Sequence, residues 1–156
     1  TVGKICGMER AMKSGLGMYA VQLGELRMAA VVAVNALGDI FDSSTGRKIA
    51  GLRTEDGTAF SDSCEELWKM GQRENLFTGN TTIGAVITNG KFNKAQMNKI
   101  ASMTRNAYAR CINPVGTMAD GDSIYAASAG EVEADLNVAG TLAAYVMERA
   151  IVAAIR

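Results

Sequence analysis

Two apolar runs separated by a Gly-Glu pair, Leu16–Leu23 and Leu26–Val34, open the patterned part of the sequence. Apolar runs of this length on either side of a short glycine-containing turn are typical of antiparallel strands in a hairpin. The second run ends in RMAAVVAVN and is almost continuously apolar, which indicates burial on both faces. The sequence therefore predicts a β-hairpin whose second strand is fully buried.

A long polar stretch follows this hairpin. Residues Asp39–Asp42 continue toward a serine-rich turn, and residues 43–80 are polar and dotted with glycine. A loop of that length inside a compact domain is usually a functional insertion or a processing site. Order returns at Thr81, where TTIGAVITN predicts a strand that places Ile83 and Ile87 on one face.

Two helical patterns complete the C-terminal half. Asn93 is placed to cap a helix over Lys94–Cys111, whose apolar residues recur at helical spacing, and Asn113-Pro114 ends it. SIYAASAG predicts a short strand, and a second helix is expected over Glu131–Ile155. Strand, helix, strand and helix after a hairpin predict an α/β fold with helices layered on a sheet.

The composition indicates one domain with a real core and excludes several classes of partner. The chain has 156 residues, 48% of them apolar, and its 16 basic and 16 acidic residues cancel. Without a basic stripe, nucleic acid and anionic membranes have nothing electrostatic to bind. The longest apolar stretches, residues 28–34 and 150–155, are far shorter than the roughly 20 residues of a membrane span. We expect a cytoplasmic protein with no nucleic-acid or membrane partner.

The start of the chain and its cysteines carry further expectations. TVGK enters structured-looking sequence at Thr1 without a signal-peptide pattern, so we expect an upstream part to be missing. The three cysteines, Cys6, Cys64 and Cys111, are odd in number and widely spaced, which argues against a disulfide framework and a thiolate metal site.

Histidine is absent from the sequence. This excludes Ser-His-Asp and Cys-His catalysis and most zinc sites. Any hydrolytic base must then be a carboxylate, a lysine or an α-amine, and we expect no metal or organic cofactor.

The junction FTGN-TTIG suggests a nucleophile. Gly79 and Asn80 tolerate strained bends, and a β-branched hydroxyl residue, Thr81, follows them at the start of a strand. Its hydroxyl is placed to attack the preceding carbonyl, and hydrolysis of the resulting ester would free an α-amine of pKa about 7.7–8.0 that can serve as base. The alternative is an ordinary loop entering a strand, with threonine chosen for its β propensity.

Four other residues are candidates for the same site. Asp120 and Asp122 would share one face if a strand begins there, and such a pair can hold an ammonium group; the alternative is an Asp-Gly turn. Asn35 follows seven apolar residues, so its NH2 group is either an oxyanion donor or part of a strand-end turn. Lys4 is a weaker candidate, a single cation in a glycine-rich opening.

These motifs, TVGK, VVAVNALGDIFDSSTG, GNTTIGAVITNGKFNKAQMNKIASM and INPVGTMADGDSIYA, occur in the order of a known family. The chain resembles the L-aminopeptidase/D-esterase family of self-processing hydrolases, which includes β-peptidyl aminopeptidases, and is most similar to its nylon-oligomer hydrolase branch. The resemblance implies an αββα sandwich like that of N-terminal-nucleophile hydrolases. It also implies cleavage between Asn80 and Thr81, so that residues 1–80 are the end of the α portion and residues 81–156 the β portion of one domain.

The resemblance assigns roles as well. It implies that Thr81 is the nucleophile, Asn35 the oxyanion donor, and Asp120, Asp122 and Lys4 site residues. The expected substrates are N-terminal amino-acid amides, short peptides or ω-amino-acid oligomers. The missing N-terminal part of the precursor and further copies of the chain are the expected partners. Two alternatives remain: an ornithine acetyltransferase-like acyl transferase, and a processed domain without catalysis.

Overall fold

The computed structural model describes residues 1–71 and 79–155. In chain order its elements are β1 (Leu16–Leu23), β2 (Leu26–Ala33), β3 (Asp39–Asp42), β4 (Arg47–Ala50), α1 (Ser63–Met70), β5 (Ile83–Gly90), α2 (Lys94–Cys111), β6 (Ile112–Asn113), β7 (Ser123–Val132) and α3 (Leu136–Ala153).

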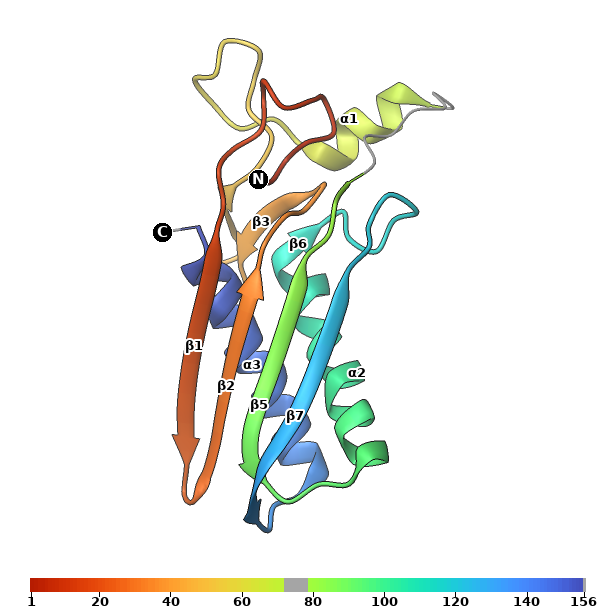
Figure 1. Ribbon diagram of the computed structural model, residues 1–156. Coiled ribbons are helices and arrows are strands. Elements are labelled where there is room, and N and C mark those ends of the chain that lie inside the picture. Colours follow the sequence, from red (N-terminus) through yellow and green to blue (C-terminus); the bar gives the residue numbers. More distant parts are fainter. Residues whose placement is uncertain (72–78, 156) are drawn as a thin grey trace.

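The strands form a large sheet of order β1-β2-β5-β7 and a small sheet of order β4-β3-β6. β2 pairs antiparallel with both β1 and β5. β5 and β7 pair in parallel, and α2 lies in the connection between them. Both long helices cover the same face of the large sheet, behind the strands in Figure 1: α3 packs on β1 and β2, and α2 packs on β7. The small sheet, α1 and the N-terminal segment lie at the end where β2 stops and β5 starts.

Several elements agree with the sequence prediction. β1 pairs with β2 from Leu16↔Ala33 to Leu23↔Leu26, which is the predicted hairpin. α2 has the predicted bounds, and the side chain of Asn93 accepts a hydrogen bond from the backbone N–H of Gln96 in a full capping box. The α/β fold with helices layered on a sheet is confirmed.

The prediction that the second strand is buried on both faces is wrong. Along β2 the residues alternate: Leu26, Met28, Ala30 and Val32 are buried under the helices, whereas Arg27, Ala29, Val31 and Ala33 are exposed or half-buried. The opposite face of the sheet is therefore open, although it is largely apolar. We call it the open face; its apolar side chains are Leu16, Met18, Ala20, Ala29, Val31, Ala33, Ile83, Ala85, Ile87, Tyr125 and Ala127.

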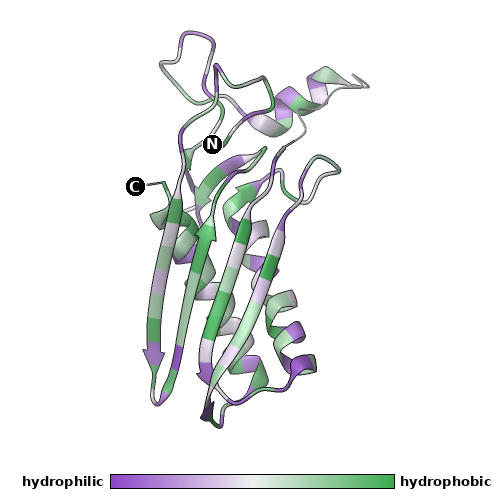
Figure 2. Cartoon of the chain, in the orientation of Figure 1, coloured by the Kyte–Doolittle hydropathy of each residue, from purple (hydrophilic) through white to green (hydrophobic). Residues whose placement is uncertain are grey.

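The open face explains the sequence pattern of the strands. Leu16 and Tyr125 remain 64% and 65% exposed on it, and green apolar bands cross the strands that face the viewer in Figure 2. When helices cover one face of a sheet and the other face is also apolar, a strand of that sheet is apolar at nearly every position. Its sequence then resembles that of a strand buried on both faces. The described residues thus form one α layer and one β layer of a layered α/β fold.

Three further boundaries differ from the prediction. The predicted loop over residues 43–80 contains β4 and α1, which is capped by Asp62, and residues 72–78 lie outside the described residues. β7 continues to Val132 rather than ending at Gly130, so the last helix begins at Leu136 after an Asp135 cap. The charged EVEAD segment belongs to the strand end and the turn.

α3 has the length and composition of a helix that could cross a membrane. Half of its apolar stretch is buried inside the fold, and its contacts are with β1, β2 and α2. These contacts are those of a core helix.

Candidate active site

Thr81 lies two residues before β5, which begins at Ile83, at the end of the large sheet beside α1 and the small sheet. The structure shows the uncut chain. The Thr81 hydroxyl Oγ1 donates to the main-chain oxygen of Asn80 at 2.7 Å, and the Thr81 N–H donates to the main-chain oxygen of Asn35 at 2.9 Å. The candidate nucleophile is therefore held against the carbonyl group that it would attack.

The Asn80 carbonyl is fixed from a second side. The Gly121 N–H donates to its oxygen at 2.8 Å, within a parallel bridge between Asn80 and Asp120 that extends the β5–β7 pairing. The residue before it, Gly79, has φ 118°, which agrees with the predicted strained bend. Asn80 itself is only 1% exposed.

Asn35 contacts the Gly79–Thr81 segment with two groups and Lys4 with a third. Its main-chain oxygen accepts from the Thr81 N–H, its Nδ2 donates to the main-chain oxygen of Gly79 at 2.9 Å, and its Oδ1 accepts from Lys4 Nζ at 2.7 Å. Because Lys4 is a pure donor, it fixes the amide with the NH2 group toward Gly79. Asn35 lies two residues beyond β2 as a half-buried, hydrogen-bonded amide.

Lys4 is placed in the site by the N-terminal segment. The Gly3 and Lys4 N–H groups donate to the main-chain oxygens of Gly38 and Leu37, and a Cβ at Gly3 would lie 2.0 Å from the Leu52 nitrogen. Lys4 is 1% exposed, and this burial lowers its pKa, partly offset by the charge of Asp120.

The two aspartates lie on different sides of the junction. Asp120 Oδ2 accepts from the N–H and hydroxyl of Thr117, and its charge acts on Lys4. Asp122 Oδ1 accepts from the Thr82 N–H at 2.8 Å. β7 begins only at Ser123, so the condition for both carboxylates to share one strand face is not met; Asp120 and Asp122 belong to the loop that leads into β7.

Burial raises the pKa of Asp122, and the Asp120 charge adds to the rise, whereas the Thr82 N–H and the Arg105 charge oppose it. Asp122 and Arg105 also line a depression of about 280 Å³ between α2 and β7. Asp122 thus contacts Thr82, the residue after Thr81, and also faces the side of the sheet that α2 covers.

Sequence reasoning missed two residues of the site. Gly121 was seen only as the middle of an Asp-Gly-Asp turn. Tyr108, on α2, directs its hydroxyl toward the main-chain oxygens of Thr82 and Ser123 at 3.4 and 3.3 Å. No local pattern identifies either residue, because both contacts join elements far apart in sequence.

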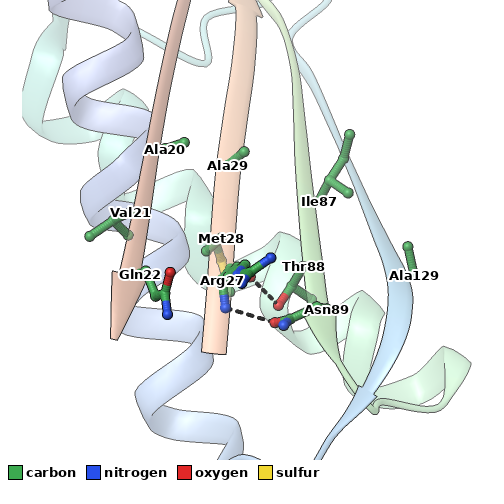
Figure 3. Close-up of a pocket in the computed structure, with 10 residues that line it drawn as sticks. All are labelled: Ala20, Val21, Gln22, Arg27, Met28, Ala29, Ile87, Thr88, Asn89 and Ala129. Carbon is green, nitrogen blue, oxygen red and sulfur yellow. Dashed lines mark hydrogen bonds between the residues drawn. The ribbon is translucent and has the colours of Figure 1, made fainter. Parts of the chain in front are cut away.

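Within residues 1–71 and 79–155, no cluster of three or more Cys, Asp or Glu side chains could hold a metal ion. A separate depression of about 470 Å³ opens at the hairpin end of the open face, between β1, β2 and β5 (Figure 3). It is lined by Gln22, Arg27, Ile87 and Asn89 among others, at the opposite end of β5 from Thr81. The hollow in Figure 3 is therefore not part of the Thr81 site.

Residues 2–156 match the sequence profile of peptidase family S58. The chain belongs to this family. An uncharacterized aminopeptidase of Mycobacterium leprae is 31% identical over 137 residues, which cover 86% of this chain and 38% of that protein. A 6-aminohexanoate-oligomer endohydrolase of Kocuria sp. is 29% identical over 140 residues, covering 85% of this chain and 38% of that protein.

Solved structures agree in fold. The L-aminopeptidase D-Ala-esterase/amidase of Ochrobactrum anthropi, described as a variant of the Ntn hydrolase fold, superposes with a TM-score of 0.57 at 16% identity, covering 93% of this chain and 40% of that one. A β-aminopeptidase of Burkholderia sp. gives 0.54 at 15% identity, covering 93% and 42%. The resemblance and the fold class predicted from the sequence are confirmed, and the chain spans about two fifths of these relatives.

Proposed function

We propose that this S58 chain is the catalytic part of a self-cleaving amide hydrolase that uses Thr81 as nucleophile. The observation that carries the proposal is the Thr81 hydroxyl, held 2.7 Å from the Asn80 carbonyl oxygen. Attack by Oγ1 on the Asn80 carbon forms an ester, and the Asn80–Thr81 C–N bond breaks as the hydroxyl proton passes to the departing amine. Water then hydrolyses the ester, which gives a carboxylate on Asn80 and a free hydroxyl and α-amine on Thr81.

The same residues support turnover after cleavage. The new α-amine of Thr81 is the general base toward its own hydroxyl, the one kind of base that comes with the nucleophile in a histidine-free chain. The Asn35 NH2 group donates to the oxyanion of the substrate. The charge of Asp120 opposes the lowering of the Lys4 pKa by burial and so favours the charged form of Lys4 beside Asn35. Asp122 accepts from the Thr82 N–H, which fixes the peptide that carries the nucleophile.

The proposed substrates are N-terminal amino-acid amides, short peptides and ω-amino-acid oligomers. The names of the relatives, aminopeptidase and 6-aminohexanoate-oligomer endohydrolase, support this class. All three classes offer an amide bond in a molecule with a free amino end, and the site around Thr81 has carboxylates that suit an ammonium group.

The open face is the proposed contact for the rest of the precursor. It carries a continuous apolar surface over all four strands of the large sheet, and the chain spans 38% of the relatives it matches. A second layer on this face would complete the sandwich expected from the family resemblance. Assembly of the completed protein into homo-oligomers remains a prediction.

The activity is tested with matured protein and two acceptors. An amino-acid amide or a 6-aminohexanoate oligomer is supplied with water alone, and an N-acetylated amino acid is supplied with glutamate. We expect hydrolysis of the amide and no acetyl transfer. Transfer without hydrolysis would support an ornithine acetyltransferase-like enzyme, and neither reaction in fully cleaved protein would indicate a domain without catalysis.

Asp120→Asn and Asp122→Asn are each expected to lower kcat on the order of 10²-fold with substrate affinity nearly unchanged, because each removes a positioning contact. Amide hydrolysis by matured variants measures both constants. Wild-type turnover in both variants would reduce the pair to a simple Asp-Gly turn.

Asp122→Asn has a second expected effect, on stability. Because burial raises the pKa of Asp122 in the folded chain, the ionised carboxylate is disfavoured there, and it costs stability as the pH rises through the folded pKa. The variant keeps an oxygen for the Thr82 N–H but carries no charge. We expect its thermal unfolding temperature at neutral pH to equal or exceed that of the wild type, and the difference to shrink as Asp122 becomes protonated in acid.

A further inference from the structure

We infer that the backbone N–H of Gly121 is the oxyanion donor for self-cleavage, whereas the Asn35 amide serves the later hydrolysis of substrate. The inference rests on the proposed function and assigns different oxyanion donors to its two reactions, self-cleavage and substrate hydrolysis. In the uncut chain the Asn80 oxygen, where negative charge would develop, accepts from Gly121 at 2.8 Å. The Asn35 NH2 group donates one residue upstream, to Gly79 at 2.9 Å.

The Gly121 donor is in place before the reaction. It belongs to the parallel bridge between Asn80 and Asp120, and the Ser123 N–H donates to the Thr82 oxygen in the same run. A donor fixed by strand pairing needs no rearrangement when the tetrahedral intermediate forms, which is the condition for strong oxyanion stabilisation. The bond already aims at the oxygen that becomes the oxyanion.

Cleavage would release the second donor. Gly79 and Asn80 occupy the space before Thr81, so a substrate can enter only after this end of the α portion has moved away. The Asn35 NH2 group then loses its Gly79 acceptor while its Oδ1 stays on Lys4, which keeps the amide oriented. The group is thereby free to donate to the carbonyl of the incoming amide.

Glycine is also required at position 121 for space. A Cβ at position 121 would lie 2.7 Å from Thr81 Oγ1. Gly121 is outside the left-handed region, so its backbone conformation allows alanine, and the steric conflict is with the Thr81 hydroxyl. Gly121 therefore combines a main-chain donor with room for the Thr81 hydroxyl.

The decisive experiment replaces Gly121 by glycolic acid through nonsense suppression. This removes the N–H and adds no atom near Thr81. The matched control is the same replacement at Gly116, an exposed glycine of the same loop. We expect the rate of cleavage at Asn80–Thr81, followed by intact mass, to fall on the order of 10²–10³-fold at position 121 and to stay at the wild-type value at position 116.

The second measurement is amide turnover per cleaved chain, after the position-121 ester has been left to mature. We expect turnover to fall far less than the rate of cleavage does, because the oxyanion of the substrate keeps its Asn35 donor. Cleavage at the wild-type rate would overturn the role of Gly121, and an equal loss of turnover would overturn the division into two donors. Uncut wild-type protein would instead contradict the proposed function itself.

Gly121→Ala provides a test that needs no ester. It keeps the N–H but crowds the Thr81 hydroxyl, so we expect slower cleavage and slower turnover from a chain that unfolds near the wild-type temperature. Wild-type rates for both reactions would overturn the requirement for glycine at position 121.

Discussion

Thr81→Ala is expected to remain a single uncut chain under conditions in which the wild type separates completely into Thr1–Asn80 and Thr81–Arg156. The side-chain oxygen that contacts the Asn80 carbonyl is the only atom that can form the ester, and alanine lacks it. The effect is therefore loss of the reaction rather than a slower rate. Intact mass of denatured protein, sampled over days, measures it.

Thr81→Ser is the matched control. It keeps the hydroxyl and the hydrogen bonds of the main chain but removes the methyl group that restricts χ1. We expect cleavage at the same bond, at a reduced rate because the hydroxyl is less firmly held. If Thr81→Ala still splits at Asn80–Thr81, an external protease makes the cut, and Thr81 belongs to an ordinary loop that enters a strand.

The sequence predicted those elements whose signals are local. The hairpin follows from two apolar runs around a glycine turn, and α2 follows from the Asn93 cap and helical spacing, so both have nearly the predicted bounds. β2 was misread because its second apolar face meets solvent in this chain rather than a buried layer. α1 was missed because its eight residues make only about two helical turns inside a polar, glycine-dotted stretch of sequence.

In the candidate site, too, the residues with a local sequence signal were predicted, whereas the contacts that depend on tertiary structure were not. Thr81, Asn35 and the aspartates stand out because a polar side chain interrupts or borders an apolar strand. Their partners depend on tertiary contacts: Lys4 reaches Asn35 from 31 positions away, and Tyr108 reaches the Thr82 oxygen from α2. The Gly121 N–H is a main-chain donor, which no side-chain pattern can reveal.

Asn35→Ala is expected to lower kcat for amide hydrolysis by roughly 10²–10³-fold, about 3–4 kcal/mol, because the amide donates most strongly when charge appears on the substrate oxygen. Alanine, however, also removes one acceptor of buried Lys4 and the donor to Gly79. Part of the loss could then come from a rearranged Lys4.

Asn35→Asp separates these effects. Aspartate keeps the size of the side chain and an oxygen for Lys4 Nζ, and it replaces the NH2 donor by an oxygen that repels the oxyanion. We expect a loss of kcat at least as large as that of the alanine variant, with the chain still folded around a Lys4–Asp contact. Self-cleavage should slow much less than hydrolysis, because the Asn80 oxygen keeps its Gly121 donor.

Hydrolysis is measured only on fully cleaved Asn35→Asp, so that slow maturation does not enter kcat. Cleavage is followed separately by intact mass. Wild-type turnover by the cleaved variant would return Asn35 to the role of a strand-end turn residue. Equal slowing of both reactions would mean that one amide serves both oxyanions, in spite of its contact with Gly79 in the uncut chain.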